Sequence, residues 1–344
     1  MTPLQQALQQ LLDKKSLDQT LMRSAMGTIM EGEADPVVIS AFLMGLRLKG
    51  EEVDELAGAA QAMRERVTRI SPKSQGLLDT CGTGGDGLHT FNISTATALL
   101  AAACGVRIAK HGNRSVSSSS GSSNVLETLG VNLQLSPEAV ARCVDEIGIG
   151  FCFAPLLHQA MKHVAPVRQK LGIRTIFNLL GPLTNPAGAE YQLLGTNSDE
   201  YAEKIAHALA KLGPKKVAVV CGNNEIDEVC LWGDTVAWIV EGNETHKVIW
   251  NPETFGLNPC TAAELAVTSP EESAAIIRDI FTGKSGGATD MVLANTAVAL
   301  WLTGHCESVR AGVERAQTVL REGGAARKLE ELIKLSNELA TGNA

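Results

Sequence analysis

Six residues near position 85 have the types and spacing of an anion-binding loop. The run Gly82-Thr83-Gly84-Gly85-Asp86-Gly87 fits the pattern G-x-G-x-x-G. It follows the strand-like run 77–81 and precedes a helical pattern that begins near residue 94. Glycines let backbone N–H groups approach a ligand closely, and the following helix adds the positive end of its dipole. The loop is therefore predicted to bind phosphate or pyrophosphate, and the alternative is a tight connection without a ligand.

Two better-known nucleotide motifs do not fit this loop. A dinucleotide-binding loop needs an acidic residue about twenty positions further on, at the end of the second strand. Here that stretch reads Ile108-Ala109-Lys110-His111. A P-loop needs a lysine directly after its last glycine, where this chain has Leu88 and His89. What remains is a general site for a phosphate group.

A basic segment and an acidic pair are the other candidates for chemistry. Lys110 to Arg114 leave the second expected strand at the edge where open α/β sheets bind ligands, so their cations converge on the same anion. Asp227 and Glu228 precede the apolar residues 229–231, which are predicted to form a strand that presents both carboxylates. Carboxylates suit Mg²⁺, but the spacing alone identifies no metal, and an exposed turn is the alternative.

A helical module is predicted for the first seventy residues. Apolar residues recur at helical spacing from Leu4 to Leu12, and Ser16 with Gln19 is interpreted as a capping box for the second helix. Asp35 and Pro36 are expected to start a third helix that runs toward residue 48, and residues 51–67 supply a fourth. No strand pattern interrupts this region.

The rest of the chain alternates between strand and helix patterns. Residues 77–109 form a predicted βαβ unit. Further strands are expected at 150–153, 192–196 and 216–221, a helix at 201–212, a hairpin from 236–240 and 247–250, and helices from residue 269 onward. The predicted fold class is therefore α/β, with a small helical domain in front.

Composition excludes several classes of function. The 344 residues carry 38 acidic and 30 basic side chains, a net charge of -8, and aromatic residues make up only 4%. These values oppose binding to nucleic acid, because a polyanion needs a basic surface and stacked bases need aromatic side chains. The longest apolar run, 96–106, is too short to cross a membrane, and no signal peptide is evident. Because the eight cysteines form no C-x-x-C pair, we expect reduced thiols and a cytoplasmic protein.

Five strings of the chain resemble the anthranilate phosphoribosyltransferase family, which catalyses the second step of tryptophan biosynthesis from chorismate. They are CGTGGDG (81–87), FNIST (91–95), KHGNRSVSS (110–118), HVAPVRQKLGIRTIFNLLGPLTNPA (163–187) and the pair Asp227-Glu228. The resemblance implies a helical N-terminal domain (1–72), joined by helices at about 160–185, and an α/β domain (73–344) with a mostly parallel central sheet, as in nucleoside phosphorylases. It also implies a homodimer, phosphoribosyl pyrophosphate and anthranilate as substrates, and Mg²⁺ with two ions per monomer.

The resemblance also assigns roles to individual residues. Lys110, Asn113 and Arg168 are the implied catalytic residues, with Arg168 holding anthranilate, although by composition Arg168 would be a solvated helix charge. Ser94, Asp227 and Glu228 are the implied metal ligands. The residues implied to bind substrate are Gly82, Gly85, Asp86, Thr90, Asn92, Ile93, Ser94, Thr95, Lys110, His111, Gly112, Asn113, Arg114, Ser115, Val116, Ser117, Ser118, Ser122, His158 and Arg168.

The chain departs from the family pattern in two places. The serine run 115–123 resembles the lid that closes over the sugar phosphate, and its alternative is a linker. Ser119 and Asn124 stand where the family has lysine and aspartate, so lid dynamics are expected to change more than the chemistry. Residues 223–226 differ from the usual glycine-leucine lead-in, which affects the pose of Asp227. A nucleoside phosphorylase needs a different signature in the glycine loop, and a nucleic-acid-binding paralogue would be basic.

Overall fold

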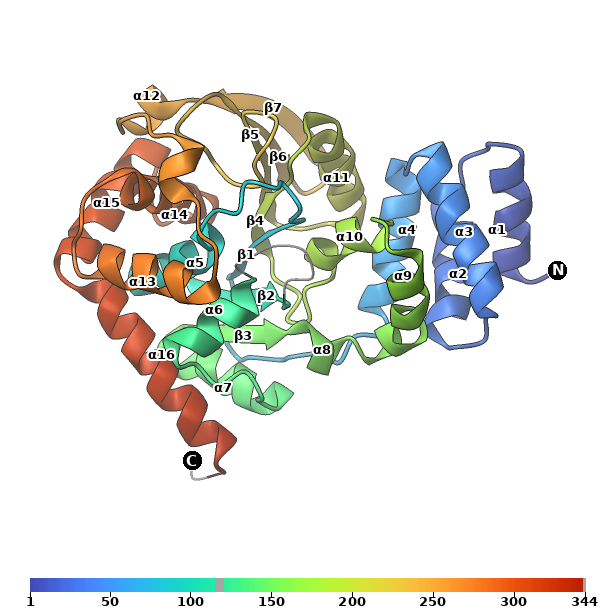
Figure 1. The fold of residues 1–344 in the computed structure, drawn as a ribbon, viewed down its shortest axis with the longest axis horizontal. Helices are drawn as coiled ribbons and strands as arrows, with labels where there is room; N and C mark the ends of the chain where they lie inside the picture. Colours follow the sequence, from blue (N-terminus) through green and yellow to red (C-terminus); the bar gives the residue numbers. More distant parts are fainter. Residues whose placement is uncertain (115–120, 343–344) are drawn as a thin grey trace.

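The computed structural model describes residues 1–114 and 121–342. Its first part is a bundle of helices at one end of the molecule (Figure 1). The bundle consists of α1 (Pro3–Leu12), α2 (Gln19–Met30), α3 (Pro36–Lys49) and α4 (Val53–Arg64). Helix α3 begins at the predicted cap, because the Asp35 carboxylate accepts a hydrogen bond from the Val37 N–H at 2.8 Å. The predicted capping box at Ser16 and Gln19 is wrong, since the N-cap of α2 is Asp18, which accepts from the Leu21 N–H at 2.8 Å.

A connecting segment lies between this bundle and the sheet (Figure 1). It contains α8 (Ala154–Leu157), a 3₁₀ helix (Gln159–His163), α9 (Ala165–Leu171), α10 (Phe177–Leu180) and a second 3₁₀ helix (Gly181–Thr184). Val164, Val167, Phe177 and Leu183 of this segment are buried in one apolar cluster with residues of α1 to α4. The segment at about 160–185 is therefore packed against the bundle, although the predicted boundary at residue 72 itself stays a prediction.

A single seven-stranded sheet forms the centre of the larger domain within the described residues, with the order β3-β2-β1-β4-β5-β6-β7. The strands from β3 to β5 pair in parallel, while β6 and β7 are antiparallel and form the predicted hairpin. Their bounds are β1 (Leu77–Gly82), β2 (Arg107–Gly112), β3 (Ile149–Phe153), β4 (Tyr191–Gly195), β5 (Lys216–Gly222), β6 (Thr235–Glu241) and β7 (Glu244–Trp250).

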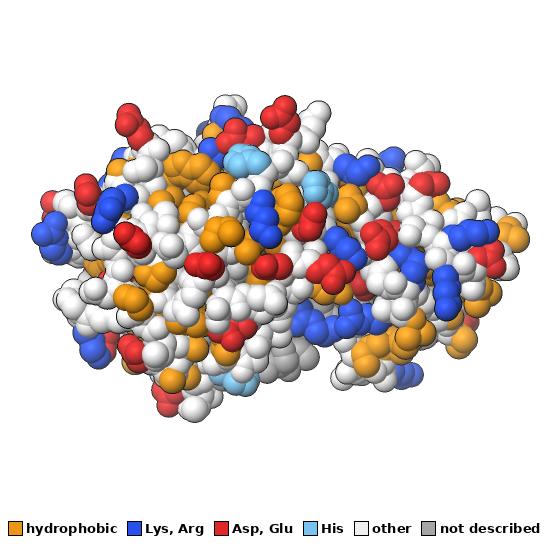
Figure 2. Space-filling view, turned by 90° about the horizontal axis from the view of Figure 1, so that it is seen from above, with side chains coloured by type: hydrophobic (Ala, Val, Ile, Leu, Met, Phe, Trp, Pro, Cys, Tyr) orange, Lys and Arg blue, Asp and Glu red, His pale blue; other side chains and the backbone are white. Residues whose placement is uncertain are grey.

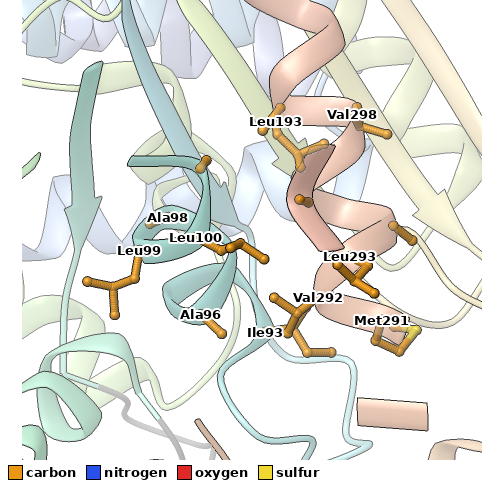
Figure 3. Packing of buried hydrophobic residues seen from close by; sticks show 14 of the residues in the cluster. Ile93, Ala96, Ala98, Leu99, Leu100, Leu193, Met291, Val292, Leu293 and Val298 are labelled. Atoms are coloured by element: carbon orange, nitrogen blue, oxygen red, sulfur yellow. The ribbon is translucent and has the colours of Figure 1, made fainter. Parts of the chain in front are cut away.

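Helices cover both faces of the sheet because its strands are apolar on both sides. Successive side chains of β4 point to opposite faces of the sheet. Leu193 packs in the apolar cluster of α5 and α14, and Leu194 packs in the apolar cluster of α11 and the helical bundle. Figure 3 shows Leu193 beside the apolar side chains of α5 and α14. The helices of this domain are α5 (Ile93–Ala103), α6 (Ser122–Leu129), α7 (Pro137–Ile147), α11 (Asp199–Leu212), α12 (Pro252–Phe255), α13 (Pro270–Phe281), α14 (Gly287–Leu302), α15 (Val309–Arg321) and α16 (Gly324–Ala340), with a 3₁₀ helix at Ala262–Leu265.

The segment that follows β5 differs from the prediction. Residues 229–231 are buried, but they form no strand, because β6 begins only at Thr235 and pairs directly with β5. Asp227 and Glu228 therefore belong to the β5–β6 loop, at the carboxyl edge of the sheet. A small helical N-terminal domain and a larger α/β domain with a mostly parallel sheet confirm the predicted fold class.

On the face drawn in Figure 2, acidic and basic side chains of the described residues are interspersed. None of the helices within 1–114 and 121–342 is long and apolar enough to span a bilayer.

Candidate active site

The glycine loop after β1 is packed tightly against the acidic pair. Gly84 and Gly85 have φ values of +68° and +77°, a backbone conformation that favours glycine. The Gly84 N–H donates to Oδ2 of Asp227 at 2.7 Å. A Cβ at Gly82 would lie 2.1 Å from the same oxygen, so the close approach requires glycine there.

Arg174 and Asn197 hold the other side of the same loop. Nη1 of Arg174 donates to the carbonyl oxygens of Gly84 at 2.9 Å and Gly85 at 3.3 Å, and Nδ2 of Asn197 donates to that of Gly85 at 2.9 Å. Neither residue was predicted from the sequence to have a role. Arg174 lies inside the string 163–187, which was the one available signal, whereas nothing in the sequence around Asn197 indicated this contact.

Lys110 reaches from β2 to the start of α5. Its Nζ donates to Oγ of Ser94 at 3.0 Å and to the Thr80 carbonyl oxygen at 2.5 Å. Asn92 caps α5 by accepting from the Thr95 N–H at 3.0 Å, and Ser94 Oγ contacts the same Asn92 oxygen at 3.3 Å. Burial lowers the pKa of Lys110, although several carboxylates oppose that effect. The helix N-terminus and this lysine thus meet beside the glycine loop.

Three carboxylates crowd together between the glycine loop and α5. Burial raises the pKa of Asp227 to about 6, and the neighbouring Asp86 adds to the shift. Burial and Asp227 also raise the pKa of Glu228, while Lys110 and a hydrogen bond from the Ser94 N–H lower it. Within residues 1–114 and 121–342, no three His, Cys, Asp or Glu side chains form a metal-binding group by themselves.

This donor set nevertheless fits Mg²⁺. Magnesium prefers oxygen ligands, and in proteins it is usually held by one or two carboxylates together with water and substrate phosphates. Asp227 and Glu228 supply buried oxygens whose mutual repulsion a cation would relieve. Ser94 is linked to Glu228 through its backbone, so the three predicted ligands lie together.

Two histidines meet at the end of β2. Nε2 of His111 and Nε2 of His158 are 3.1 Å apart, and the two rings are tilted at 43° to each other. Burial lowers the pKa of His111 to about 3, with His158 as the second cause, and burial lowers that of His158 to about 4. Both rings are therefore neutral near pH 7.

Acid is expected to destabilise the protein through these histidines. Their folded pKa values lie below the ordinary 6.5. Below pH 6.5 these histidines bind protons in the unfolded chain but not in the folded one. The free energy of unfolding is therefore retained above pH 6.5 and falls below it. Between pH 6.5 and 5 the loss is about 2 kcal/mol per histidine. In denaturant unfolding at both pH values, His111→Gln with His158→Gln should lose less stability than the parent, and an equal loss would contradict this assignment.

The remaining predicted residues lie around the same edge. Gly112 ends β2, and a Cβ there would lie 2.3 Å from Oγ of Ser122 at the start of α6. Asn113 is exposed, and Arg114 forms a 2.7 Å ion pair with Glu127. The predicted residues Ser115, Val116, Ser117 and Ser118 lie outside the described residues.

The last predicted site residues are Arg168 and the side chains at the start of α5. Arg168 lies on α9 with its Cζ 5.4 Å from the centre of the Phe177 ring, and burial lowers its pKa. It is half-buried, so it differs from the freely solvated charge that composition alone suggested. Ile93 and Thr95, in the first turn of α5, are buried, and Thr90 pairs through its backbone with Ala266.

Comparison with known proteins identifies the family. Residues 5–67 match the model described as the helical bundle domain of a glycosyl transferase family, and residues 74–326 match its a/b domain. The chain is 46% identical over 334 residues to the anthranilate phosphoribosyltransferase of Thioalkalivibrio sulfidiphilus, covering 97% of this chain and 98% of that protein.

Solved structures agree with this result. The crystal structure of the Thermus thermophilus enzyme of that name superimposes with a TM-score of 0.90 at 40% identity, covering 96% of this chain and 99% of the other. The Saccharomyces cerevisiae enzyme, solved in complex with PRPP and Mg, gives a TM-score of 0.90 at 29% identity and covers 98% of both chains. The chain therefore belongs to the anthranilate phosphoribosyltransferase family.

Proposed function

We propose that this protein transfers the phosphoribosyl group of 5-phosphoribosyl 1-pyrophosphate to the amine of anthranilate. The products are N-(5-phosphoribosyl)anthranilate and pyrophosphate, as in the second step of tryptophan biosynthesis. The observation that carries the proposal is the convergence of Lys110, the N-terminus of α5 and the acidic pair on the glycine loop. Relatives named anthranilate phosphoribosyltransferase, which align with nearly the whole length of this chain, support it.

The leaving group determines what the phosphate site must do. The bond between ribose C1 and a pyrophosphate oxygen breaks, a bond between C1 and the amine nitrogen forms, and the nitrogen releases one proton to solvent. Negative charge builds on the departing pyrophosphate. Lys110 and the backbone N–H groups of Gly85 and Asp86 stabilise that charge, because hydrogen bonds hold the lysine and the loop in place before the reaction.

Asp227, Glu228 and Ser94 are the proposed ligands for Mg²⁺, with two ions per monomer. When bound, Mg²⁺ supplies positive charge to the pyrophosphate oxygens. The yeast relative was solved with PRPP and Mg and, as a variant, with Mg bound. In this chain the crowded carboxylates are the feature that calls for such a cation.

We propose that anthranilate binds to Arg168 and Asn113, with His111 and His158 nearby. Its aromatic amine is already neutral at pH 7, so positioning matters more than proton removal. A guanidinium offers a planar fork that matches a carboxylate, and Arg168 is half-buried beside the Phe177 ring. The neutral His111–His158 pair presents no charge to the aromatic ring. The lid residues 115–118 and Ser122 are proposed to close over the sugar phosphate.

Replacement of Arg168 should separate the two substrates. Arg168→Ala removes a charge-assisted contact, so the KM for anthranilate should rise by about ten- to a hundredfold. The KM for phosphoribosyl pyrophosphate should stay unchanged, and Arg168→Lys should restore only part of the loss. Two steady-state titrations, each with the other substrate saturating, provide the measurement. If both constants rise together, Arg168 organises the domain interface instead, and if neither rises it has no substrate role.

The assembly and the setting of the enzyme are part of the same proposal. We infer a homodimer, a cytoplasmic location and a helical domain that spans residues 1–72.

The stoichiometry of the reaction is the direct chemical test of the proposed activity. One pyrophosphate should appear for each anthranilate consumed, and only with both substrates and Mg²⁺ present. Pyrophosphate release that does not require anthranilate would contradict the proposed acceptor.

A further inference from the structure

The outer side of the glycine loop is held by two side chains from distant parts of the chain. Arg174 comes from the connecting segment between α9 and α10, and Asn197 comes from the loop between β4 and α11. Between them they donate three hydrogen bonds to the carbonyl oxygens of Gly84 and Gly85. A Cβ at Gly85 would lie 1.6 Å from Nη1 of Arg174, so the guanidinium lies directly against the loop backbone.

These contacts fix the direction of the N–H groups. In a trans peptide the carbonyl and the N–H point in opposite directions, and no cis peptide occurs among the described residues. The Gly84 carbonyl shares its peptide with the Gly85 N–H, and the Gly85 carbonyl shares its peptide with the Asp86 N–H. When Arg174 and Asn197 hold both carbonyls on the outer side, both N–H groups must point to the inner side. There they can serve as anion donors without reorganisation.

The outer side of the loop borders a cavity. Its volume is about 210 Å³, and its lining includes Arg47, Glu51 and Tyr201 beside Gly85, Arg174 and Asn197. Arg47 Nη1 donates to the Tyr201 hydroxyl at 3.0 Å, so these two side chains bond to each other. Without Arg174, solvent would replace the guanidinium and the two peptides could rotate.

The charge of Arg174 points to the same role. Within the described part of the chain, the hydrogen bonds of this guanidinium go to the two uncharged loop carbonyls. A half-buried cation whose charge is not neutralised favours a nearby anion.

We propose that Arg174, assisted by Asn197, is a positioning residue for the diphosphate of phosphoribosyl pyrophosphate. It acts through the backbone of the glycine loop, which it holds from the connecting segment. This inference rests on the proposed function, because the anion is the one named there. Arg168, six residues earlier, is the residue proposed to bind anthranilate. The connecting segment would therefore supply one residue to each substrate site.

The test uses binding of phosphoribosyl pyrophosphate with Mg²⁺, measured by calorimetry without anthranilate, together with the KM for each substrate. Arg174→Ala should weaken this binding by about ten- to a hundredfold, the loss expected for hydrogen bonds to a charged group. The KM for anthranilate should be unchanged. Asn197→Ala should have a smaller effect in the same direction. Arg174→Lys should restore part of the affinity, because an ammonium keeps the charge but lacks the fork.

Arg315→Ala is the matched control. Arg315 also donates to two backbone carbonyls, those of His305 at 2.8 Å and Cys104 at 2.7 Å, but it lies on α15 away from the loop. Its loss should lower the melting temperature without changing the affinity for phosphoribosyl pyrophosphate. If Arg174→Ala does not fold, Arg174→Lys and Asn197→Ala carry the test.

The outcomes distinguish this inference from the proposed function. Unchanged affinity in folded Arg174→Ala, or in both milder variants, overturns the positioning role even when the parent enzyme consumes anthranilate. Weakened affinity in a protein whose parent binds phosphoribosyl pyrophosphate but leaves anthranilate unreacted supports the positioning role and contradicts the proposed acceptor. A KM for anthranilate that rises equally would mean that Arg174 holds the whole connecting segment, and that result also overturns the inference.

Discussion

Asp227→Asn combined with Glu228→Gln should lower kcat/KM by about a thousandfold or more at low Mg²⁺. Amides keep the shape of the carboxylates but remove two negative charges, and with them the main hold on the cation. Loss of transition-state charge stabilisation worth several kcal/mol corresponds to a rate loss of that order. Because burial opposes ionisation of both side chains, the fold should not suffer, and the melting temperature without Mg²⁺ should stay equal or rise.

The measurement is a Mg²⁺ titration of turnover at saturating substrates. The half-saturating Mg²⁺ concentration should move upward in the double variant, and high Mg²⁺ should restore only part of the rate. Glu225→Gln is a suitable control, since Glu225 is an acidic side chain of the same loop that bonds to Asn223 and Trp232. Near-normal turnover of the double variant at low Mg²⁺ would place the metal elsewhere.

Gly84→Val should weaken binding of phosphoribosyl pyrophosphate by about a hundredfold or more. Gly84 has a φ of +68°, a conformation that costs a residue with a Cβ about 1–2 kcal/mol and a β-branched residue more. The loop would relieve that strain by turning its peptides, which breaks the Gly84–Asp227 hydrogen bond and moves the N–H donors. The anion thus loses several contacts through one substitution.

Gly242→Val separates this effect from general strain. Gly242 has a φ of +61° with open space around it, and it lies in the β6–β7 hairpin. Calorimetry should show a large loss of affinity for Gly84→Val and none for Gly242→Val, while both variants melt at lower temperature than the parent. Equal affinity in Gly84→Val and the parent would show that the loop is only a connection.

Those parts of the site that are close in sequence were predictable. The glycine loop, the start of α5 and the end of β2 follow from local patterns, because glycine spacing, helical periodicity and strand ends are each specified within a few residues. Parallel pairing of β1 with β2 then brings Lys110 to Ser94, and the sequence implied that approach through the βαβ unit. The fold class followed from the same alternation.

Contacts between distant segments were not predictable in this way. Arg174 and Asn197 approach Gly85 only because the connecting segment and the β4–α11 loop pack there, and neither carries a local pattern. Residues 229–231 are apolar enough for a strand, but β6 takes the place beside β5 and leaves them as buried loop. At α2, both Ser16 and Asp18 are good caps, and the register of the helix decided for Asp18.

The most direct test of the central claim is the fluorescence of anthranilate on mixing the folded protein with phosphoribosyl pyrophosphate and Mg²⁺. The account predicts a steady decrease as anthranilate is consumed, which requires all three components and is lost in Asp227→Asn with Glu228→Gln. A stable signal from folded protein that binds phosphoribosyl pyrophosphate would contradict the account, because the anion site would then serve another acceptor.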